Sequence, residues 1–202
     1  MKLSNKNIVV FASGSGTNFI SLYNKVKENK INGNIVLLIS NNKNCGAVDF
    51  AKKNNIKFEI VNKFRYDSDQ GILDRYKVLL EKYLPDLIVL AGFMKKIPLE
   101  IVSMYRQRIL NIHPSLLPEF GGKGYYGLNV HRAVIEANKK ESGATVHFVN
   151  EEYDKGSIVL QQSTPVLEID TPESLAERVL KIEYEIYYKA VKMFCENKIK
   201  LD

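Results

Sequence analysis

The fold class is clearest from residues 7–40, NIVVFASGSGTNFISLYNKVKENKINGNIVLLIS. An apolar, β-branched run at 7–12 is followed by a glycine-rich turn, an amphipathic segment at 18–28 and a second apolar run at 34–40. A strand, a helix and a strand in this order form a βαβ unit, whose two strands lie parallel in one sheet. Residues 7–40 therefore predict an α/β protein.

The alternation of strand-like and helix-like segments continues along the chain. Residues 87–91 are all apolar, as in a strand buried on both faces, and residues 144–149 and 158–166 predict a hairpin joined by a turn at 150–156. We expect a Rossmann-like, open, mostly parallel sheet with helices on both faces, in a single domain spanning residues 1–202. The other predicted helices are 47–54, 71–83, 98–105, 130–138 and 172–197, and the other predicted strands are 58–61 and 109–112.

Composition and charge restrict the classes of partner. The 202 residues are 45% hydrophobic and 26% charged, with a formal net charge of +6, which is usual for a globular protein that favours anionic ligands. The lysines are spread along predicted helices rather than gathered in a basic block, so we expect small-molecule substrates and no nucleic-acid partner. No signal-peptide pattern or apolar run of membrane-spanning length occurs, so we expect a cytoplasmic protein without a membrane partner. As a separate expectation, the protein is a monomer or a homodimer.

The cysteines and two of the histidines do not form a recognisable metal site. Cys45 and Cys195 are too few for a disulfide framework or a zinc cluster, and we expect both to be reduced. His131 and His147 do not stand at a metal-ligand spacing, so we expect no metal. His147 alternates with apolar residues, which favours a structural role, whereas His131 begins a predicted helix where it could line a cleft. Cys45 has no histidine nearby in sequence, so we expect no nucleophilic role for it.

Residues 111–118, NIHPSLLP, at the end of a predicted strand, contain the residues best suited to catalysis. Asn111 and His113 are two residues apart, so on an extended segment both project to one side and can converge on a developing oxyanion. Asp154 could supply a distant carboxylate that orients and charges the imidazole. Taken alone, each of these three residues is better interpreted as a turn residue or a core residue than as a catalytic one. Together, with two prolines fixing the backbone around the histidine, they indicate a catalytic group.

Residues 13–18, SGSGTN, lie between the first predicted strand and helix. Glycines there allow close approach to a phosphate, and the helix N-terminus supplies unpaired amides and a positive dipole end. The loop lacks the lysine of a P-loop and the third glycine of a dinucleotide fingerprint, and residues 40–42 contain no acidic group for a ribose. The predicted ligand is a monophosphate. The alternative is a tight turn in which Ser15 or Thr17 caps the helix.

Residues 119–128 contain four glycines and two tyrosines without helical or strand periodicity. The segment is long and flexible enough to be a lid over the histidine beside it. A permanently packed surface loop is the alternative.

These motifs together resemble the folate-dependent formyltransferases. The resemblance covers nearly the whole chain in the same order, through residues 13–18, 90–94 (LAGFM), 111–118 and 152–156. NIHPSLLP combined with a downstream Asp-x-Gly is highly specific, whereas the glycine loop alone is not.

The resemblance implies transfer of a formyl group from the co-substrate 10-formyltetrahydrofolate to the amine of 5-phosphoribosylglycinamide in purine biosynthesis, without a covalent enzyme intermediate. It implies that Asn111 and His113 stabilise the tetrahedral oxyanion, that His113 relays a proton, and that Asp154 holds His113 and an ordered water. It further assigns the substrate phosphate to Gly16, Thr17 and Asn18, the substrate amine to Glu183, and the folate to Met94, Lys95, Lys96, Ile97, Asn111, Asn150, Glu151, Glu152, Tyr153 and Asp154.

The sequence departs from the family pattern at two places. Lys95 stands where many members carry arginine, so a contact that needs a planar guanidinium is in doubt, and residues 119–131 are longer than the family's short form.

Three alternative functions are weaker. Methionyl-tRNA formyltransferase carries an additional C-terminal tRNA-binding domain and formyltetrahydrofolate deformylase usually an extra N-terminal domain, and we expect neither domain here. A non-catalytic nucleotide- or RNA-binding module would account for the net charge of +6 but would not need Asn111, His113 and Asp154.

Overall fold

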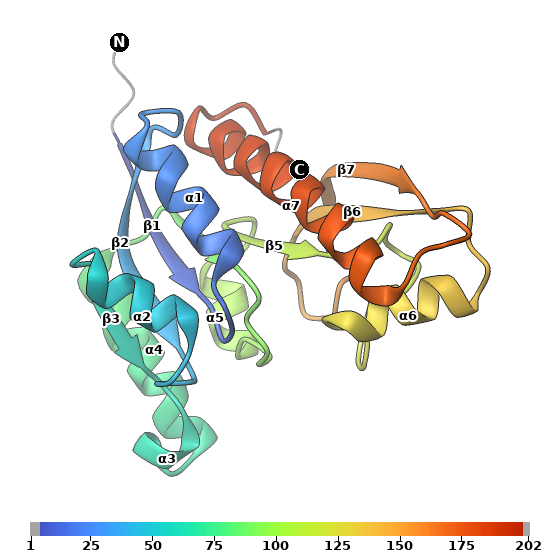
Figure 1. Cartoon of the computed structure of the whole chain (residues 1–202). Helices are drawn as coiled ribbons and strands as arrows, with labels where there is room; N and C mark the ends of the chain where they lie inside the picture. Colours follow the sequence, from blue (N-terminus) through green and yellow to red (C-terminus); the bar gives the residue numbers. More distant parts are fainter. Residues whose placement is uncertain (1–4, 200–202) are drawn as a thin grey trace.

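The computed structural model describes residues 5–199, in which one seven-stranded sheet is covered by helices on both faces (Figure 1). The strand order is β3-β2-β1-β4-β5-β6-β7; β3 to β5 are parallel, and β6 and β7 are antiparallel to their neighbours. The strands are β1 (Lys6–Phe11), β2 (Gly33–Ser40), β3 (Phe58–Ile60), β4 (Leu87–Leu90), β5 (Ile109–His113), β6 (Glu141–Phe148) and β7 (Ile158–Pro165). The helices are α1 (Thr17–Lys27), α2 (Gly46–Lys53), α3 (Lys63–Tyr66), α4 (Asp69–Tyr83), α5 (Leu99–Met104), α6 (Leu128–Glu136) and α7 (Pro172–Cys195).

Alternate residues of the central strands fill two cores, because successive strand side chains point to opposite faces. In β1, Ile8 and Val10 pack with residues of α1, α2 and α7, whereas Val9 and Phe11 pack with residues of α4 and α5. Figure 1 shows α1, α2 and α7 on the near face of the sheet. Burial on both faces explains why residues 87–91 contain no polar side chain.

The observed sheet confirms the predicted fold class; every predicted element is present with its bounds shifted by at most three residues, and one short helix was not predicted. α3 was not predicted, because its four residues are too short to show helical periodicity. β6 begins three residues before the predicted 144, since Glu141 to Gly143 pair with Ser163 to Pro165 of β7. α4 begins at Asp69 rather than at 71, because the Ser68 hydroxyl accepts a hydrogen bond from Gly71 N–H and caps the helix.

The carboxyl ends of β1, β4 and β5 lie side by side, and the predicted site residues 16–18, 94–97, 111 and 113 lie at or just after these strand ends. Beneath this edge, the buried Tyr187 of α7 places its hydroxyl 2.9 Å from the Leu90 carbonyl oxygen and 3.0 Å from that of Leu110. The long helix is thereby attached to β4 and β5 near the residues that carry the chemistry. Within residues 5–199, none of the helices has the length and apolar character needed to cross a membrane.

Candidate active site

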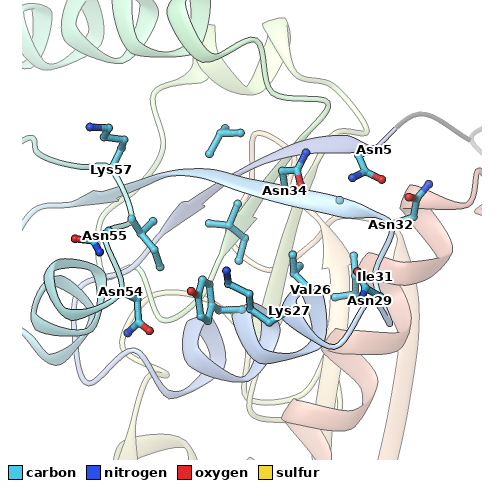
Figure 2. A pocket seen from close by; sticks show the side chains of 15 residues that line it. Asn5, Val26, Lys27, Asn29, Ile31, Asn32, Asn34, Asn54, Asn55 and Lys57 are labelled. Atoms are coloured by element: carbon cyan, nitrogen blue, oxygen red, sulfur yellow. The ribbon is translucent and has the colours of Figure 1, made fainter.

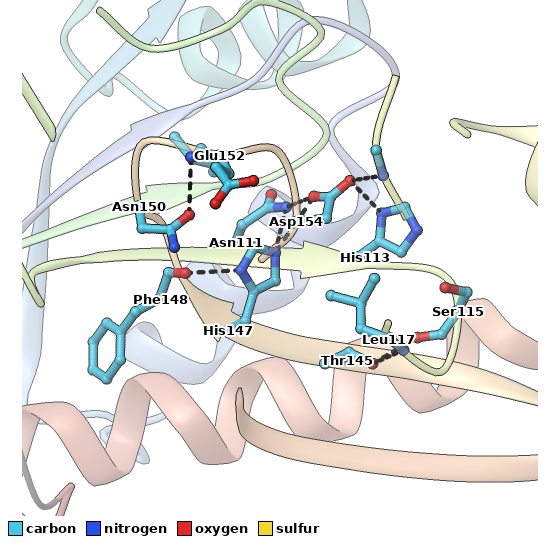
Figure 3. Close-up of polar contacts among 12 residues, drawn as sticks. Asn111, His113, Ser115, Leu117, Thr145, His147, Phe148, Asn150, Glu152 and Asp154 are labelled. Atoms are coloured by element: carbon cyan, nitrogen blue, oxygen red, sulfur yellow. Dashed lines mark hydrogen bonds and ion pairs between the residues drawn. The ribbon is translucent and has the colours of Figure 1, made fainter. Parts of the chain in front are cut away.

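Asp154, predicted from a separate part of the sequence, contacts both Asn111 and His113 (Figure 3). Asn111 is within β5, His113 is its last residue, and Asp154 belongs to the turn between β6 and β7. One carboxylate oxygen of Asp154 is 3.4 Å from Asn111 Nδ2, and the other is 3.6 Å from His113 Nδ1. The carboxylate therefore lies between the amide and the imidazole.

The loop of residues 119–128 fixes Asp154 from the other side. The backbone N–H of Gly122 donates to Asp154 Oδ2 at 2.8 Å. A Cβ on Gly121 would lie 2.6 Å from Leu117 Cδ2 and 3.3 Å from Asp154 Cβ, so a larger residue there would displace the Leu117 side chain and press on Asp154. Asp154 itself has a φ of 54°, a left-handed conformation that residues other than glycine adopt uncommonly. The segment predicted as a lid therefore contributes directly to the site.

His113 is held so that one ring nitrogen faces Asp154. Its Nε2 lies 2.7 Å from the carbonyl oxygen of Phe120, which can only accept, so Nε2 carries a proton. Burial lowers the pKa of His113 and outweighs the opposite effects of Asp154 and the Phe120 carbonyl. At neutral pH the imidazole is therefore neutral, with the lone pair of Nδ1 directed toward the carboxylate.

Asp154 remains ionised at neutral pH. Burial alone would raise the pKa of Asp154, but the nearby His147 and His113 side chains and the Gly122 N–H together lower that pKa below its ordinary value. A carboxylate beside a neutral imidazole can stabilise that imidazole when it accepts a proton.

His147 is a fourth member of the site that the sequence pattern favoured as structural. It lies opposite Asn111 in the β5–β6 register. Its Nδ1 is 2.8 Å from the Phe148 carbonyl oxygen and so carries the proton, which leaves Nε2 to accept from Asn111 Nδ2 at 3.1 Å. His147 thereby orients the Asn111 amide.

The glycine-rich loop leaves the start of α1 open to a ligand. Gly16 is the N-cap residue with φ 78° and ψ 19°, and within residues 5–199 this helix start has no side-chain cap hydrogen bond. The alternative in which Ser15 or Thr17 caps the helix is therefore wrong. A Cβ on Gly16 would lie 2.8 Å from Ala47 Cα, because α2 packs closely against the loop. Thr17 is the first helical residue, so the backbone N–H groups of the first turn have no partner within the helix and can bind an anion.

Asn18 and Glu183 are 165 positions apart in sequence and form a buried polar pair. Asn18 Nδ2 donates to Glu183 Oε2 at 2.6 Å, while Asn18 Oδ1 is buried without a hydrogen-bond partner in the described part of the chain. Burial raises the pKa of Glu183 to about 7, although the bond from Asn18 acts in the opposite direction. The pair brings together two residues predicted to contact the phosphorylated substrate.

The two segments predicted to bind the folate also meet. Lys96 Nζ lies 5.3 Å from the ring centroid of Tyr153. Lys95 is exposed beside it, as are Glu151 and Glu152 in the opposite loop, where Asn150 Oδ1 accepts from Glu152 N–H at 3.1 Å. The buried side chain of Ile97 packs in the core with α4 and α5, which leaves only its backbone for a ligand. Met94 is exposed and donates its N–H to Ser13 Oγ.

Other candidate features are not part of this group of residues, although His131 lies close enough to His113 for that imidazole to add to the effect of burial in lowering the pKa of His131. A hollow of about 480 Å³ lies where β2 begins and α1 and α2 end, lined by asparagines, two lysines and apolar residues (Figure 2). It contains none of the predicted site residues. His131 is buried, and its Nδ1 has no hydrogen-bond partner within residues 5–199. Cys45 and Cys195 are buried free thiols.

The chain is similar in sequence and structure to known enzymes of one family. A family model described as formyl transferase matches residues 6–191. The chain is 45% identical to the chloroplastic phosphoribosylglycinamide formyltransferase of Arabidopsis thaliana, over 96% of this chain and 67% of that protein. It is 35% identical to phosphoribosylglycinamide formyltransferase of Escherichia coli, over 96% of this chain and 90% of that protein. The structure of glycinamide ribonucleotide transformylase 1 from Symbiobacterium toebii matches with a TM-score of 0.91 and 34% identity, over 98% of this chain and 91% of that one. The resemblance in the motifs is thereby confirmed, and the chain belongs to the formyl transferase family.

Proposed function

We propose that the chain transfers the formyl group of 10-formyltetrahydrofolate to the amine of 5-phosphoribosylglycinamide, and that Asn111, His113 and Asp154 act on the reacting carbon. The observation that carries this proposal is the contact of these three side chains at the carboxyl end of β5, next to an open helix N-terminus at the end of β1. The names of the similar proteins, which cover most of this chain, support the same reaction.

The phosphorylated acceptor would bind along α1 and α7. The amides at the start of α1 would bind its phosphate, since a helix N-terminus supplies unpaired donors and a positive dipole end. Glu183 would receive its amine. With a pKa of about 7, this carboxylate is a better base than an exposed glutamate and can take a proton from the substrate ammonium, which leaves the neutral amine needed for attack.

The amine nitrogen would then attack the formyl carbon, and the carbonyl oxygen would become an oxyanion. Both amide protons of Asn111 face acceptors, and the contact with Asp154, at 3.4 Å, is longer than the one with His147, at 3.1 Å. The longer contact is the one to be exchanged for the oxyanion, while His147 keeps the amide oriented.

Proton transfer would complete the reaction through His113. An ordered water held by Asp154 would relay a proton from the attacking nitrogen to His113 Nδ1, and Asp154, 3.6 Å from that nitrogen, would stabilise the resulting imidazolium. The same proton then passes to N10 of the folate as the bond between N10 and the formyl carbon breaks. The products are the formylated acceptor and tetrahydrofolate, and no bond to the enzyme forms.

Several expectations from the sequence stay predictions. These are the single domain over 1–202, the monomer or homodimer, the absence of metal and of nucleic-acid and membrane partners, and the role of each site residue. Cytoplasmic location also stays a prediction, since the similar Arabidopsis protein is named as chloroplastic.

An acceptor competition assay tests the proposed function. The enzyme is given 10-formyltetrahydrofolate with phosphoribosylglycinamide, with initiator methionyl-tRNA, or with water alone, and tetrahydrofolate release is followed. We expect turnover with phosphoribosylglycinamide only. Formate release without an acceptor would instead indicate a hydrolase, and formylation of the tRNA would indicate a methionyl-tRNA formyltransferase; either result contradicts the proposal.

A further inference from the structure

Ser13 joins the loop assigned to the phosphate to the segment assigned to the folate. It follows β1, and its backbone N–H donates to the Gly92 carbonyl oxygen at 3.1 Å. Its hydroxyl accepts from Met94 N–H at 2.9 Å and donates to Asn41 Oδ1 at 2.6 Å. A single buried residue thus connects the loops that follow β1, β2 and β4.

The orientation of the Ser13 hydroxyl is fixed by its partners. A hydroxyl has one proton, and the Asn41 side-chain oxygen can only accept, so that proton points at Asn41 and a lone pair is left for Met94 N–H. The backbone oxygen of Asn41 in turn accepts from Asn62 Nδ2 at 2.9 Å, which anchors the acceptor. With these bonds formed, the hydroxyl donates its only proton within the protein and has none to donate to a substrate.

The glycine-rich loop is also held from its other side. Ala47 N–H, at the start of α2, donates to the Gly14 carbonyl oxygen at 3.2 Å. A Cβ on Gly46 would lie 2.5 Å from the Ser15 carbonyl oxygen, so α2 and the loop are in close contact. The loop therefore has little freedom toward α2, and Ser13 fixes it relative to residues 92–97.

We propose that Ser13 is a positioning residue that sets the distance between the two substrates. This inference rests on the proposed function, because it takes residues 16–18 as the phosphate site and 94–97 as part of the folate site. Transfer requires the amine nitrogen and the formyl carbon to approach within about 3–3.5 Å, and a misplacement of about 1 Å costs on the order of 10²-fold in rate. Loss of the hydroxyl lowers the rate of transfer and leaves each substrate's own contacts in place.

Ser13→Ala tests the proposal through a split between kcat and binding. We expect kcat to fall by about 10- to 100-fold, while the Kd values for phosphoribosylglycinamide and for a non-transferable folate analogue each change by less than about threefold. The matched control is Ser68→Ala, which also removes a hydroxyl that accepts a backbone N–H, here Gly71 N–H at 3.0 Å, but at the exposed start of α4. We expect this control to keep kcat within about twofold of the parent, although it loses helix-cap stability.

Asn41 supplies an independent test that leaves Ser13 in place. Asn41→Ala removes the acceptor that orients the hydroxyl and should lower kcat several-fold at saturating substrates. Asn41→Asp keeps an acceptor oxygen at the same place and should recover most of the loss. This pair also decides the matter if Ser13→Ala does not fold.

The outcomes separate this inference from the proposed function. If the parent enzyme does not formylate phosphoribosylglycinamide, the proposed function fails. If the parent is active, the positioning role is overturned by any one of three results: a Ser13→Ala kcat within twofold of the parent, an equal loss in Ser68→Ala, or an Asn41→Ala kcat that is unchanged or that Asn41→Asp does not recover.

Discussion

Glu183→Gln should stabilise the protein at alkaline pH while impairing the acceptor site. Glu183 is 9% exposed, and burial raises the pKa of its carboxyl group to about 7 from an ordinary value of 4.5. The protonated form is thus favoured by folding, so the stability linked to this group is fully present below about pH 4.5 and is lost as the pH rises through about 7. At roughly 1.4 kcal/mol per pKa unit, the difference of about 2.5 units gives a loss of about 3 kcal/mol at pH 8.

The substitution removes this loss because glutamine is neutral and of nearly the same size. Its amide oxygen can keep the hydrogen bond from Asn18 Nδ2, and its NH₂ group can donate to Asn18 Oδ1, which has no partner among the described residues. We therefore expect Glu183→Gln to exceed the parent in free energy of unfolding by up to about 3 kcal/mol at pH 8 and to match it near pH 4.5.

Urea unfolding followed by circular dichroism at the two pH values measures this difference. Glu185→Gln is the matched control, because it changes the same residue type on an exposed position of α7 and should alter stability by less than about 0.5 kcal/mol at either pH. The variant should also raise KM for the phosphorylated acceptor. Two results would refute a buried Glu183 carboxyl with a raised pKa. One is that Glu183→Gln gives no gain in the free energy of unfolding at pH 8, and the other is that the gain is equal at both pH values.

Three further predictions concern the rest of the site. Asp154→Asn should lower kcat and move the acid limb of the rate profile to lower pH, because Asp154 raises the pKa of His113 whereas burial lowers it; an unchanged profile would remove Asp154 from the proton transfer. Asn18→Ala should raise KM for phosphoribosylglycinamide at least several-fold and leave the binding of a folate analogue unchanged. Weaker folate binding with an unchanged KM would mean that residues 16–18 belong to the folate site and not to the phosphate site. Trypsin should cleave after Lys123 rapidly in the free enzyme and slowly with both substrate analogues bound, if residues 119–128 order over them; equal rates would identify a permanently packed loop.

The sheet was predictable because its signal is local. The apolar runs and the glycine-rich turn in residues 7–40 specify a βαβ unit without knowledge of the rest of the chain. Asn111 and His113 were predictable for a similar reason, since a spacing of two on a strand places both side chains on one face.

The remaining site contacts depend on features that side-chain patterns do not contain. His147 meets Asn111 through the register of an antiparallel strand pair, which the sequence alone does not specify at this position. Phe120 and Gly122 act through a backbone oxygen and a backbone N–H, and every residue type except proline carries both groups. Ser13 was noted only as part of a glycine-rich loop, because its contacts with Asn41 and Met94 arise from the folding of three separate strands.

The kcat of His113→Ala at saturating concentrations of both substrates tests the central claim most directly. His113 is placed to accept and return the transferred proton beside Asp154, but its burial leaves it little contact area for either substrate. We predict a fall in kcat on the order of 10² to 10⁴, with the Kd for a folate analogue changed by less than about threefold. A His113→Ala enzyme that turns over within about threefold of the parent rate would contradict the catalytic role assigned to this cluster.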